Sequence, residues 1–432
     1  MKIVYLAAGA AGMYCGSCLH DNTLAAALSA LGQDVLLVPT YTPLRTDEDN
    51  VSDSHLFFGG INVFLQQYSA VFRHTPWFLD ALLDNPGVIR WLTRGGPRLE
   101  AERLGGLTVS MLQGEHGRQR KELEKLVRWL KEEAKPDIVH LSNAMLVGMA
   151  REIRALGIPV LSTLSGEDIF LEKLPQPYYE QAREALRERA REVDGFVALN
   201  RYYADFMASY LDVPRERVHV IPHGLNLAGH GTRSERSDEV RTIGFLARVC
   251  PDKGLHNLIA AAELLLSDPG VPPFRVRAAG YLSRLDRPYL ETIQARTRRW
   301  DKPGAFEYVG ELTRAQKIAF LQNLDVMSLP TVYHESKGLP VLEALANGVP
   351  VVLPEHGAFP ELVEHTGGGL LHRGDDPVSL ARVLKQLLLD PPLAAELGMR
   401  GQQAVRRDYT AEVMAQKTLE LYRQTLVAAG SK

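Results

Sequence analysis

Cysteine is scarce in this sequence: its 432 residues include 3 cysteines, Cys15, Cys18 and Cys250. So few cysteines cannot build the disulfide framework that holds small secreted domains together. The chain must instead fold around apolar cores, which suits a reducing compartment. We therefore expect a cytoplasmic protein.

An excess of basic charge and long apolar runs are also missing. Lys and Arg number 49 against 52 Asp and Glu, which gives a formal net charge of −3. Dedicated nucleic-acid binders normally carry a basic excess, so no nucleic-acid partner is expected. No stretch reaches the roughly 18 apolar residues that a spanning helix needs. A helix pattern at 122–135 is rich in Lys and Arg, but its apolar stripe fits a core contact, so the sequence gives no support for membrane association.

Short apolar runs alternate with helix-period segments over nearly the whole chain. Most runs lack the alternation of half-exposed strands, which predicts strands that are covered on both faces. Repeated strand–helix alternation is typical of doubly wound α/β sheets. The expected strands are 3–7, 35–38, 138–141, 159–164, 196–199, 218–221, 242–246, 274–278, 306–309, 326–329 and 349–353.

A polar segment at 226–239 divides these strands into two groups, and its lack of apolar periodicity is typical of a linker. We expect one Rossmann-like domain over residues 1–225 and a second over residues 226–409. Residues 41–106 fit the first sheet poorly and are interpreted as an insertion over its carboxyl edge. A terminal helix at about 410–432 is expected to pack back on the first domain.

The segment 334–352, HESKGLPVLEALANGVPVV, is the most informative stretch of the sequence. Seven residues lie between Glu335 and Glu343, among them a glycine and a proline. This pattern predicts a loop that turns into a helix, since proline is favoured in a first helical turn. The backbone N–H groups near Gly338 and Leu339 would then face outward as a site for phosphate. Carboxylates on either side match the adjacent hydroxyls of a ribose or hexose.

A second segment, GFLARVCPDKG at 244–254, places two cations after a predicted strand. Arg248 and Lys253 lie at the carboxyl end of that strand, the edge where such sheets bind ligands. Arg bridges two phosphate oxygens and Lys adds a compact charge. Together they would stabilise the growing negative charge of a departing diphosphate.

These two segments, together with the IPHGLN run at 221–226, resemble the GT-B-fold retaining glycosyltransferases of family four. The resemblance is strong over the second half of the chain and covers the first half in outline. It implies two doubly wound Rossmann-like domains facing a central cleft. It also implies transfer of a hexose from a nucleotide-diphosphate sugar with retention of configuration, without a metal ion or other cofactor. The acceptor is expected to be a carbohydrate or a glycolipid.

The resemblance assigns catalytic roles to three charged residues, Glu335, Arg248 and Lys253. The two cations would hold the donor diphosphate, and Glu335 would contact the transferred sugar. The further donor-binding residues that it implies are Gly338 and Leu339 at the phosphates, Glu343 at the ribose, Tyr308 beside the base and Gly16 in the first domain.

The acceptor side departs from the family pattern. Family members have a histidine in a T-x-H-G/D run, whereas this chain reads TLSGED at 163–168, with Ser165 at the histidine position. Glu167, Asp168 or His20 is expected to take over the contact that this histidine makes.

Other interpretations remain open at this point. The CGSC run of Cys15 and Cys18 is similar to thiol-redox motifs, but an incidental or structural pair is favoured because further metal ligands are not obvious nearby. A non-catalytic nucleotide-sugar binder would bind the donor without turnover. A glycoside hydrolase would use the two glutamates as acid and nucleophile, with no need for a diphosphate site.

Overall fold

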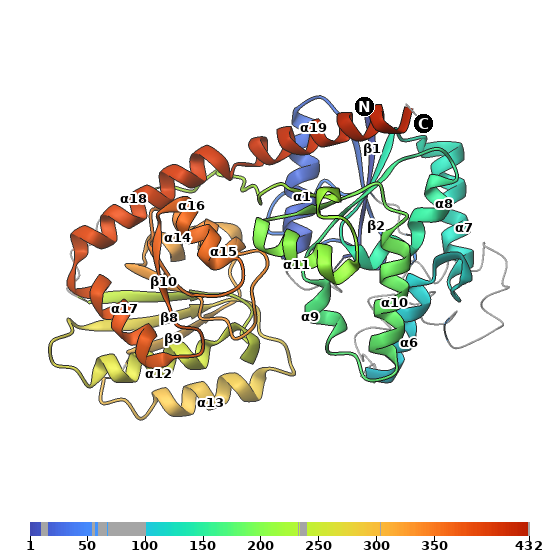
Figure 1. Cartoon of the computed structure of the whole chain (residues 1–432). Helices are drawn as coiled ribbons and strands as arrows, with labels where there is room; N and C mark the ends of the chain where they lie inside the picture. Colours follow the sequence, from blue (N-terminus) through green and yellow to red (C-terminus); the bar gives the residue numbers. More distant parts are fainter. Residues whose placement is uncertain are drawn as a thin grey trace. The chain divides into compact units, whose positions relative to one another are not determined.

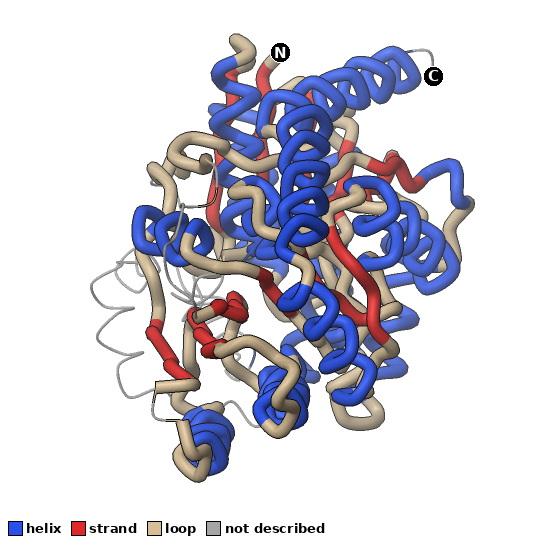
Figure 2. Tube along the Cα trace, turned by 90° about the vertical axis from the view of Figure 1, so that its left-hand side faces the viewer, coloured by secondary structure: helices blue, strands red, loops and turns tan. Residues whose placement is uncertain are grey.

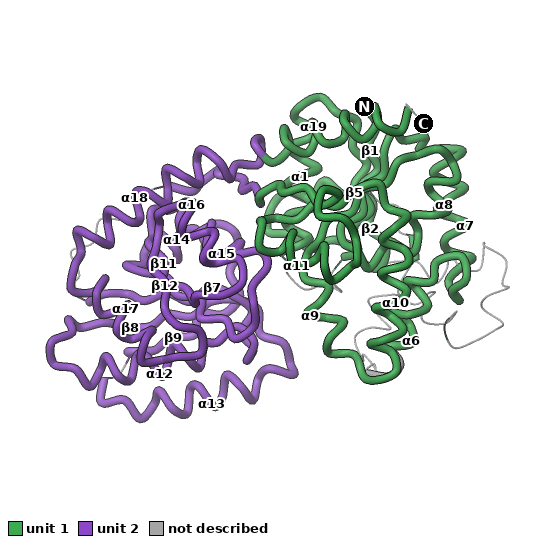
Figure 3. The backbone as a smooth tube through the Cα atoms, in the orientation of Figure 1, with its two compact units in different colours: residues 1–222, 414–432 green, residues 223–413 purple. Residues whose placement is uncertain are grey.

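The computed structural model describes residues 1–9, 16–53, 57–58, 67, 101–231, 233, 240–302 and 304–430. The chain divides into two compact units, residues 1–222 with 414–432 (unit 1) and residues 223–413 (unit 2) (Figures 1 and 3). Each unit contains a six-stranded parallel sheet with helices around the strands (Figure 2). The expected α/β class with two doubly wound sheets is confirmed.

The sheet of unit 1 has the order β2-β1-β3-β4-β5-β6, and all its strands are parallel. Its strands are β1 (Lys2–Ala7), β2 (Asp34–Pro39), β3 (Ile138–Leu141), β4 (Val160–Thr163), β5 (Gly195–Ala198) and β6 (Val218–Val220). Its α-helices are α1 (Gly16–Ala30), α6 (Ala101–Leu112), α7 (Arg120–Trp129), α8 (Ala150–Arg154), α9 (Glu167–Leu171), α10 (Tyr178–Ala190), α11 (Arg201–Leu211) and α19 (Ala411–Gly430), of which the last starts in unit 2.

Burial explains why these strands read as continuous apolar runs. Every residue of β3, β4 and β5 is buried, so both faces of the central strands are covered. Helices on both sides of a parallel sheet cause this pattern. The helix expected at 122–135 is also present: α7 continues through one π-helical turn, and its Leu123 and Leu126 are buried in the core. The stripe is therefore a core contact, as predicted.

The terminal helix α19 is fixed to unit 1 by a polar contact inside the core. The fully buried Tyr422 lies against His140 of β3, with 2.6 Å between the phenol oxygen and Nδ1. The other ring nitrogen of His140 lies 2.8 Å from Oγ1 of Thr163, at the end of β4. Burial, followed by the charge of His20, lowers the pKa of His140 to about 3, so the ring is neutral.

The segment interpreted as an insertion, 41–106, lies partly outside the described residues. The part after β2 is held against α1 by the buried Asn22, whose amide donates to the carbonyl of Asp49 at 2.9 Å and accepts from the N–H of Val51 at 2.9 Å. Cys15 lies outside the described residues, while Cys18 is buried in α1.

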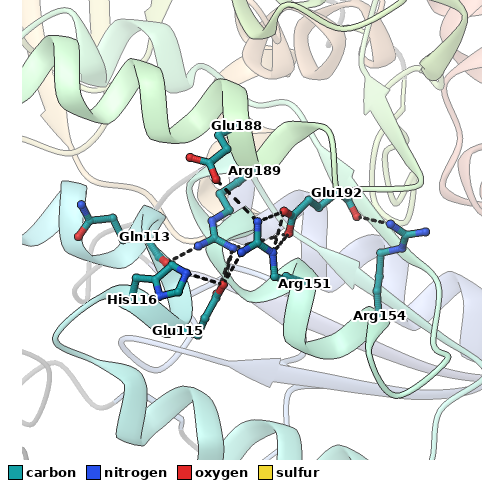
Figure 4. Close-up of polar contacts among 8 residues, drawn as sticks. All are labelled: Gln113, Glu115, His116, Arg151, Arg154, Glu188, Arg189 and Glu192. Atoms are coloured by element: carbon teal, nitrogen blue, oxygen red, sulfur yellow. Dashed lines mark hydrogen bonds and ion pairs between the residues drawn. The ribbon is translucent and has the colours of Figure 1, made fainter.

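A cluster of charged side chains joins three helical segments of unit 1 (Figure 4). Arg189 of α10 is almost completely buried and donates to Glu115 Oε1 at 3.0 Å and to the carbonyl of Gln113 at 2.6 Å. Arg151 of α8 donates to the same Glu115 oxygen at 2.8 Å, and its Nε donates to Glu192 at 2.8 Å. The cluster thus compensates a buried arginine with carboxylates, the condition under which charge is tolerated in a core.

The sheet of unit 2 has the order β12-β11-β10-β7-β8-β9, again with parallel strands. Its strands are β7 (Arg241–Leu246), β8 (Phe274–Ala279), β9 (Phe306–Gly310), β10 (Val326–Ser328), β11 (Val351–Pro354) and β12 (Gly369–His372). Its α-helices are α12 (Leu255–Leu266), α13 (Arg287–Thr297), α14 (Arg314–Gln322), α15 (Leu339–Ala346), α16 (Phe359–Thr366), α17 (Pro377–Leu389) and α18 (Pro391–Asp408).

The sequence analysis missed the edge strand β12. Its four residues follow two glycines and contain a single pair of leucines, too short a pattern to be distinguished from a loop. The other strands lie within two residues of the expected positions.

The segment interpreted as a linker is packed on unit 2 over its described residues. Arg314 of α14 donates to the carbonyls of Asn226 at 2.7 Å and Ala228 at 2.9 Å. The amide of Asn347 accepts from the N–H of Gly231 at 3.1 Å. The compact units accordingly divide between residues 222 and 223 and between 413 and 414, whereas the sequence suggested 225/226 and 409/410. Among the described helices, none has the combination of length and apolar character needed to cross a bilayer.

Candidate functional site

The strand order of unit 2 determines where its strand ends converge. β7 and β10 are hydrogen-bonded neighbours, although β8 and β9 come between them in the chain. The connections after β7 and β10 therefore leave in opposite directions, and α/β sheets bind ligands outside the carboxyl ends of strands at such a point. Arg248 and Lys253 follow β7, and Glu335 follows β10.

A short 3₁₀ turn, Pro251–Lys253, carries the lysine to the segment after β10. Gly254 ends this turn with φ of 74°, and a Cβ at this position would overlap the carbonyl oxygen of Pro330. The N–H of Val332 also donates to the carbonyl of Asp252 at 3.0 Å. A glycine is therefore required after the lysine, because the two segments approach each other backbone to backbone.

Lys253 and Glu335 form a buried ion pair, with 2.7 Å between Nζ and Oε2. Tyr333 completes this contact: its hydroxyl donates to the same carboxylate oxygen at 2.6 Å and accepts from Lys253, whose Nζ lies 4.8 Å from the centre of the ring. Burial alone would raise the pKa of Glu335, but Lys253 and the hydrogen bonds outweigh it and lower the pKa to about 2. Glu335 is therefore a carboxylate at neutral pH.

The backbone around Glu335 is held as firmly as its side chain. The N–H groups of Ser336 and Lys337 donate to Glu335 Oε1 at 3.2 and 3.1 Å. The carbonyl of Glu335 accepts from the N–H of Ala358 at 2.8 Å. Gly357, with φ of 63°, allows this approach because a Cβ there would meet the backbone of Glu335. The glutamate is thus positioned by the loops after both β10 and β11.

Arg248 belongs to the same cluster through Tyr333. Its side chain is exposed, and its Nε lies 3.4 Å from Sγ of Cys250. The pKa of Tyr333 is raised by burial and by Glu335, while the charge of Arg248 opposes the rise. Arg248 and Lys253 therefore act on one tyrosine, and both cations lie near the Glu335 turn.

The predicted helix start follows this turn. α15 begins at Leu339, with Gly338 as its N-cap at φ of 72° and a proline in the first turn. Gly338 has no side chain that could cap this helix through a hydrogen bond. The first turn of an uncapped helix presents N–H groups and the positive end of the helix dipole, which favour an anion.

Glu343 is buried in the middle of α15 and pairs with a cation that the sequence analysis missed. Lys317 of α14 lies with its Nζ 2.5 Å from Oε1 of Glu343. Asn347, one turn later, donates to the carbonyl of Glu343 at 2.9 Å. No sequence spacing relates Lys317 to Glu343, since only the packing of α14 on α15 joins them.

Tyr308 lies in the middle of β9, which is on the other side of β8 from β7. Its hydroxyl donates to the carbonyl of Gly280 at 2.8 Å. Gly280 has a φ of 136°. A Cβ at this position would overlap the carbonyl of Ala247, in the loop that leads to Arg248. The ends of β7, β8 and β9 are thus linked next to the cation loop.

The acceptor-side residues suggested by the sequence lie in unit 1, where Ser165 and Asp168 are close together. The buried Glu167 accepts from the N–H groups of Ala144 at 2.9 Å and Ser165 at 2.8 Å, so it shapes the loop. Tyr203, which the sequence analysis missed, donates to Asp168 at 2.6 Å and accepts from the N–H of Gly166 at 2.8 Å.

The other two candidates in unit 1 lie on α1. Gly16 is the first residue of the helix, and its phosphate role stays a prediction. His20 is buried, and its charge contributes to the lowered pKa of His140. Its acceptor role also stays a prediction.

Two family models match the chain. The model described as glycosyl transferases group 1 matches residues 232–404, and that described as glycosyltransferase family 4 matches residues 78–228. Between them they cover about three quarters of the sequence.

Two curated relatives are named as a glycosyltransferase and as a maltose-phosphate synthase. A D-inositol 3-phosphate glycosyltransferase of Corynebacterium urealyticum is 30% identical over 51% of this chain, a match that spans 54% of the relative. An alpha-maltose-1-phosphate synthase of Mycolicibacterium smegmatis is 27% identical over 66% of this chain and 79% of the relative. The match to the first of these relatives therefore spans about half of its length.

Solved structures match over nearly the whole chain. Sucrose-phosphate synthase from Thermosynechococcus elongatus has a TM-score of 0.71 at 17% identity and covers 99% of this chain and 100% of its own. The Anabaena protein HepE in complex with UDP has a TM-score of 0.67 at 17% identity, with 98% of this chain and 100% of its own covered. At these identities the likeness concerns the fold, which in both units agrees with that described above.

Proposed function

The chain belongs to the group 1 glycosyltransferases of family four, and from that membership we propose that it transfers a hexose from a nucleotide-diphosphate sugar to a carbohydrate or glycolipid acceptor. We further propose that the anomeric configuration is retained and that the reaction, in the cytoplasm, needs no metal ion or other cofactor. The observation that carries the proposal is the Lys253–Glu335 ion pair where β7 meets β10, directly before the uncapped start of α15.

The charges of this site suit a departing diphosphate. Lys253, Arg248 and the N-terminus of α15 all favour negative charge, and they come from segments held by backbone contacts. Preorganised cations of this kind stabilise the charge that develops as the sugar–phosphate bond breaks. They supply what a metal ion supplies in other phosphate sites.

The glutamates fit sugar binding better than hydrolytic catalysis. A hydrolase needs one carboxyl group that stays protonated near neutral pH. The pKa of Glu335 is lowered to about 2, so it cannot serve as that acid. Glu343 is paired with Lys317. Ionised carboxylates accept hydrogen bonds from hydroxyls, which favours the sugar and ribose roles.

The names of the relatives support the class of substrates. They include D-inositol 3-phosphate and a phosphatidylinositol monomannoside, and one relative in Corynebacterium glutamicum is named as GDP-mannose-dependent. HepE was solved with UDP-glucose. Sugars of uridine and guanosine diphosphate are therefore the first donors to test.

Binding of a nucleoside diphosphate is the first test. We expect one of UDP, GDP or ADP to stabilise the protein by about 2.7 kcal/mol at a hundredfold excess over its dissociation constant. Lys253→Ala should lose most of this stabilisation. Lys385→Ala is the matched control, because Lys385 pairs with Asp268 on the surface of the same unit.

Turnover separates an enzyme from a binding protein. Wild type should release nucleoside diphosphate from the matching nucleotide sugar when acceptor is present, and Glu335→Gln should reduce this release at least about a hundredfold. Thermal stabilisation by none of the nucleotides would contradict the proposal at its base. Stabilisation without any transfer would favour the non-catalytic binder.

A further inference from the structure

Glu335 has no acceptor position left for a sugar hydroxyl while Lys253 is bound to it. An ionised carboxylate offers about four lone-pair positions. Oε1 accepts from two backbone N–H groups, and Oε2 accepts from Lys253 at 2.7 Å and Tyr333 at 2.6 Å. All four positions are therefore occupied by protein donors.

A donor diphosphate resolves this conflict by competing for the lysine. Lys253 is the most mobile of the four donors, because a flexible four-carbon stem carries its ammonium group, whereas the two N–H groups belong to a backbone fixed by Ala358. If the ammonium turns to the diphosphate, one position on Oε2 opens for the sugar. The buried carboxylate then loses its cation, a change that would normally drive it to take up a proton.

Tyr333 is placed to prevent that protonation. Its hydroxyl already donates to Oε2 at 2.6 Å, and its oxygen also accepts from Lys253, whose Nζ lies 4.8 Å from the ring centre. When the ammonium group turns to the diphosphate, the phenol can keep its hydrogen bond to the carboxylate. Burial and Glu335 also raise the pKa of the phenol, so its proton stays in place as a donor.

We propose that Tyr333 is a positioning residue of the donor site, which keeps Glu335 ionised and oriented while Lys253 turns from Glu335 to the donor diphosphate. The inference rests on the proposed function, since it requires a nucleotide-diphosphate donor. It extends that function by making the sugar contact of Glu335 dependent on prior engagement of the diphosphate.

The test is proton uptake on binding. Calorimetry of wild type and Tyr333→Phe with the stabilising nucleoside diphosphate, in two buffers that differ in ionisation enthalpy, measures protons bound per site near pH 6. The terminal phosphate of the nucleotide itself titrates near about pH 6, so the two proteins are compared. Tyr333→Phe should take up a substantial fraction of one proton more than wild type. Turnover of the variant should fall by about ten- to a hundredfold, the size expected for losing a hydrogen bond to a charged group.

Tyr179→Phe is the matched control. The Tyr179 hydroxyl of α10 accepts from Arg183 at 2.8 Å, and the guanidinium group lies 6.0 Å from its ring centre, so it repeats the tyrosine–cation contact in unit 1. This variant should behave as wild type. If Tyr333→Phe binds with wild-type proton uptake and wild-type turnover, the inference is overturned. If wild type itself binds no nucleoside diphosphate, the proposed function falls, and this inference with it.

A second variant tests the inference without nucleotide or loss of the tyrosine. In Lys253→Met, Glu335 depends on Tyr333 and the two N–H groups alone, as in the donor-bound state. If these donors suffice, the stability of the variant changes between pH 7 and pH 5 as that of wild type does. A gain on acidification relative to wild type would mean that Glu335 has a raised pKa in the folded state and takes up a proton on folding, which would overturn the inference.

Discussion

At the scale of single residues, both glutamates of the donor site are paired with a lysine from another segment. Lys253 reaches Glu335 from the loop after β7, and Lys317 reaches Glu343 from α14. The two lysines differ in their other contacts and in their exposure to solvent. Lys253 also donates to the Tyr333 hydroxyl and its side chain is 19% exposed, whereas the side chain of Lys317 is 11% exposed. We therefore expect Lys253 to move on donor binding and Lys317 to stay.

Replacing Lys317 should separate stability from binding. Lys317→Met leaves a buried carboxylate without its cation, which costs about 3–5 kcal/mol of the free energy of unfolding of unit 2. The double variant Lys317→Met/Glu343→Leu should recover most of this loss, because an apolar pair can replace a buried ion pair. Urea unfolding measures both variants.

The same double variant should still fail to bind nucleoside diphosphate, since the carboxylate proposed to bind the ribose is absent. Recovery of both stability and binding would show that Glu343 is structural. Failure to recover stability would show that the cost lies in packing rather than in charge.

At the scale of elements, the charge cluster of Figure 4 fixes η1 (Gly114–His116), α8 and α10 to one another. Arg189 is the centre of this cluster because it bonds both Glu115 and the carbonyl of Gln113. Burial alone would raise the pKa of Glu115, but hydrogen bonds and Arg189 lower it. Apolar contacts alone would allow several relative positions of these helices. A charge cluster of this kind selects one of them.

Removing the central arginine should destabilise unit 1 strongly. Arg189→Met leaves two carboxylates short of a cation and a carbonyl without its donor, so we expect a loss of about 3 kcal/mol or more. Arg191→Ala is the control on the same turn of the chain: its pair with Asp212 is exposed and should contribute less than about 1 kcal/mol. Equal effects of the two variants would contradict the role of the cluster.

At the scale of the whole molecule, both units contain groups whose pKa values are lowered in the folded state. The pKa of His140 in unit 1 is lowered to about 3, so the stability from its neutral ring is present above about pH 6.5 and is lost as the pH falls towards 3. Burial also lowers the pKa values of His256, His356 and His372 in unit 2. Both units should therefore lose stability as the pH falls below about 6.5.

Each unit contains a buried cysteine that reports its opening. Cys18 lies in unit 1 and Cys250 in unit 2. In a Cys15→Ala background, labelling with dithiodipyridine, read by mass spectrometry, should follow the opening of each unit as the pH falls. His140→Gln should be less stable at pH 7 but should lose less stability of unit 1 between pH 6.5 and 4, because its side chain takes up no proton. Equal loss of Cys18 protection in His140→Gln and in the Cys15→Ala background would contradict the prediction.

Local sequence patterns determined the elements and much of the donor site. Apolar runs without alternation identified eleven strands, since strands covered on both faces must be apolar throughout. The proline and glycines of the 334–352 segment identified the start of α15, because helix starts depend on a few neighbouring residues. Arg248, Lys253 and Glu335 followed from their places after strands in a parallel sheet.

Tertiary structure alone decided which side chains meet. Lys317 and Glu343 come from different helices, and Tyr203 reaches Asp168 from α11, so no spacing in the sequence relates these pairs. Tyr333 stands two residues before Glu335, yet its role depends on a lysine 80 residues away that strand order brings to it. A sequence specifies the period and ends of each element through local physics, whereas the partners of a buried charge depend on how those elements pack.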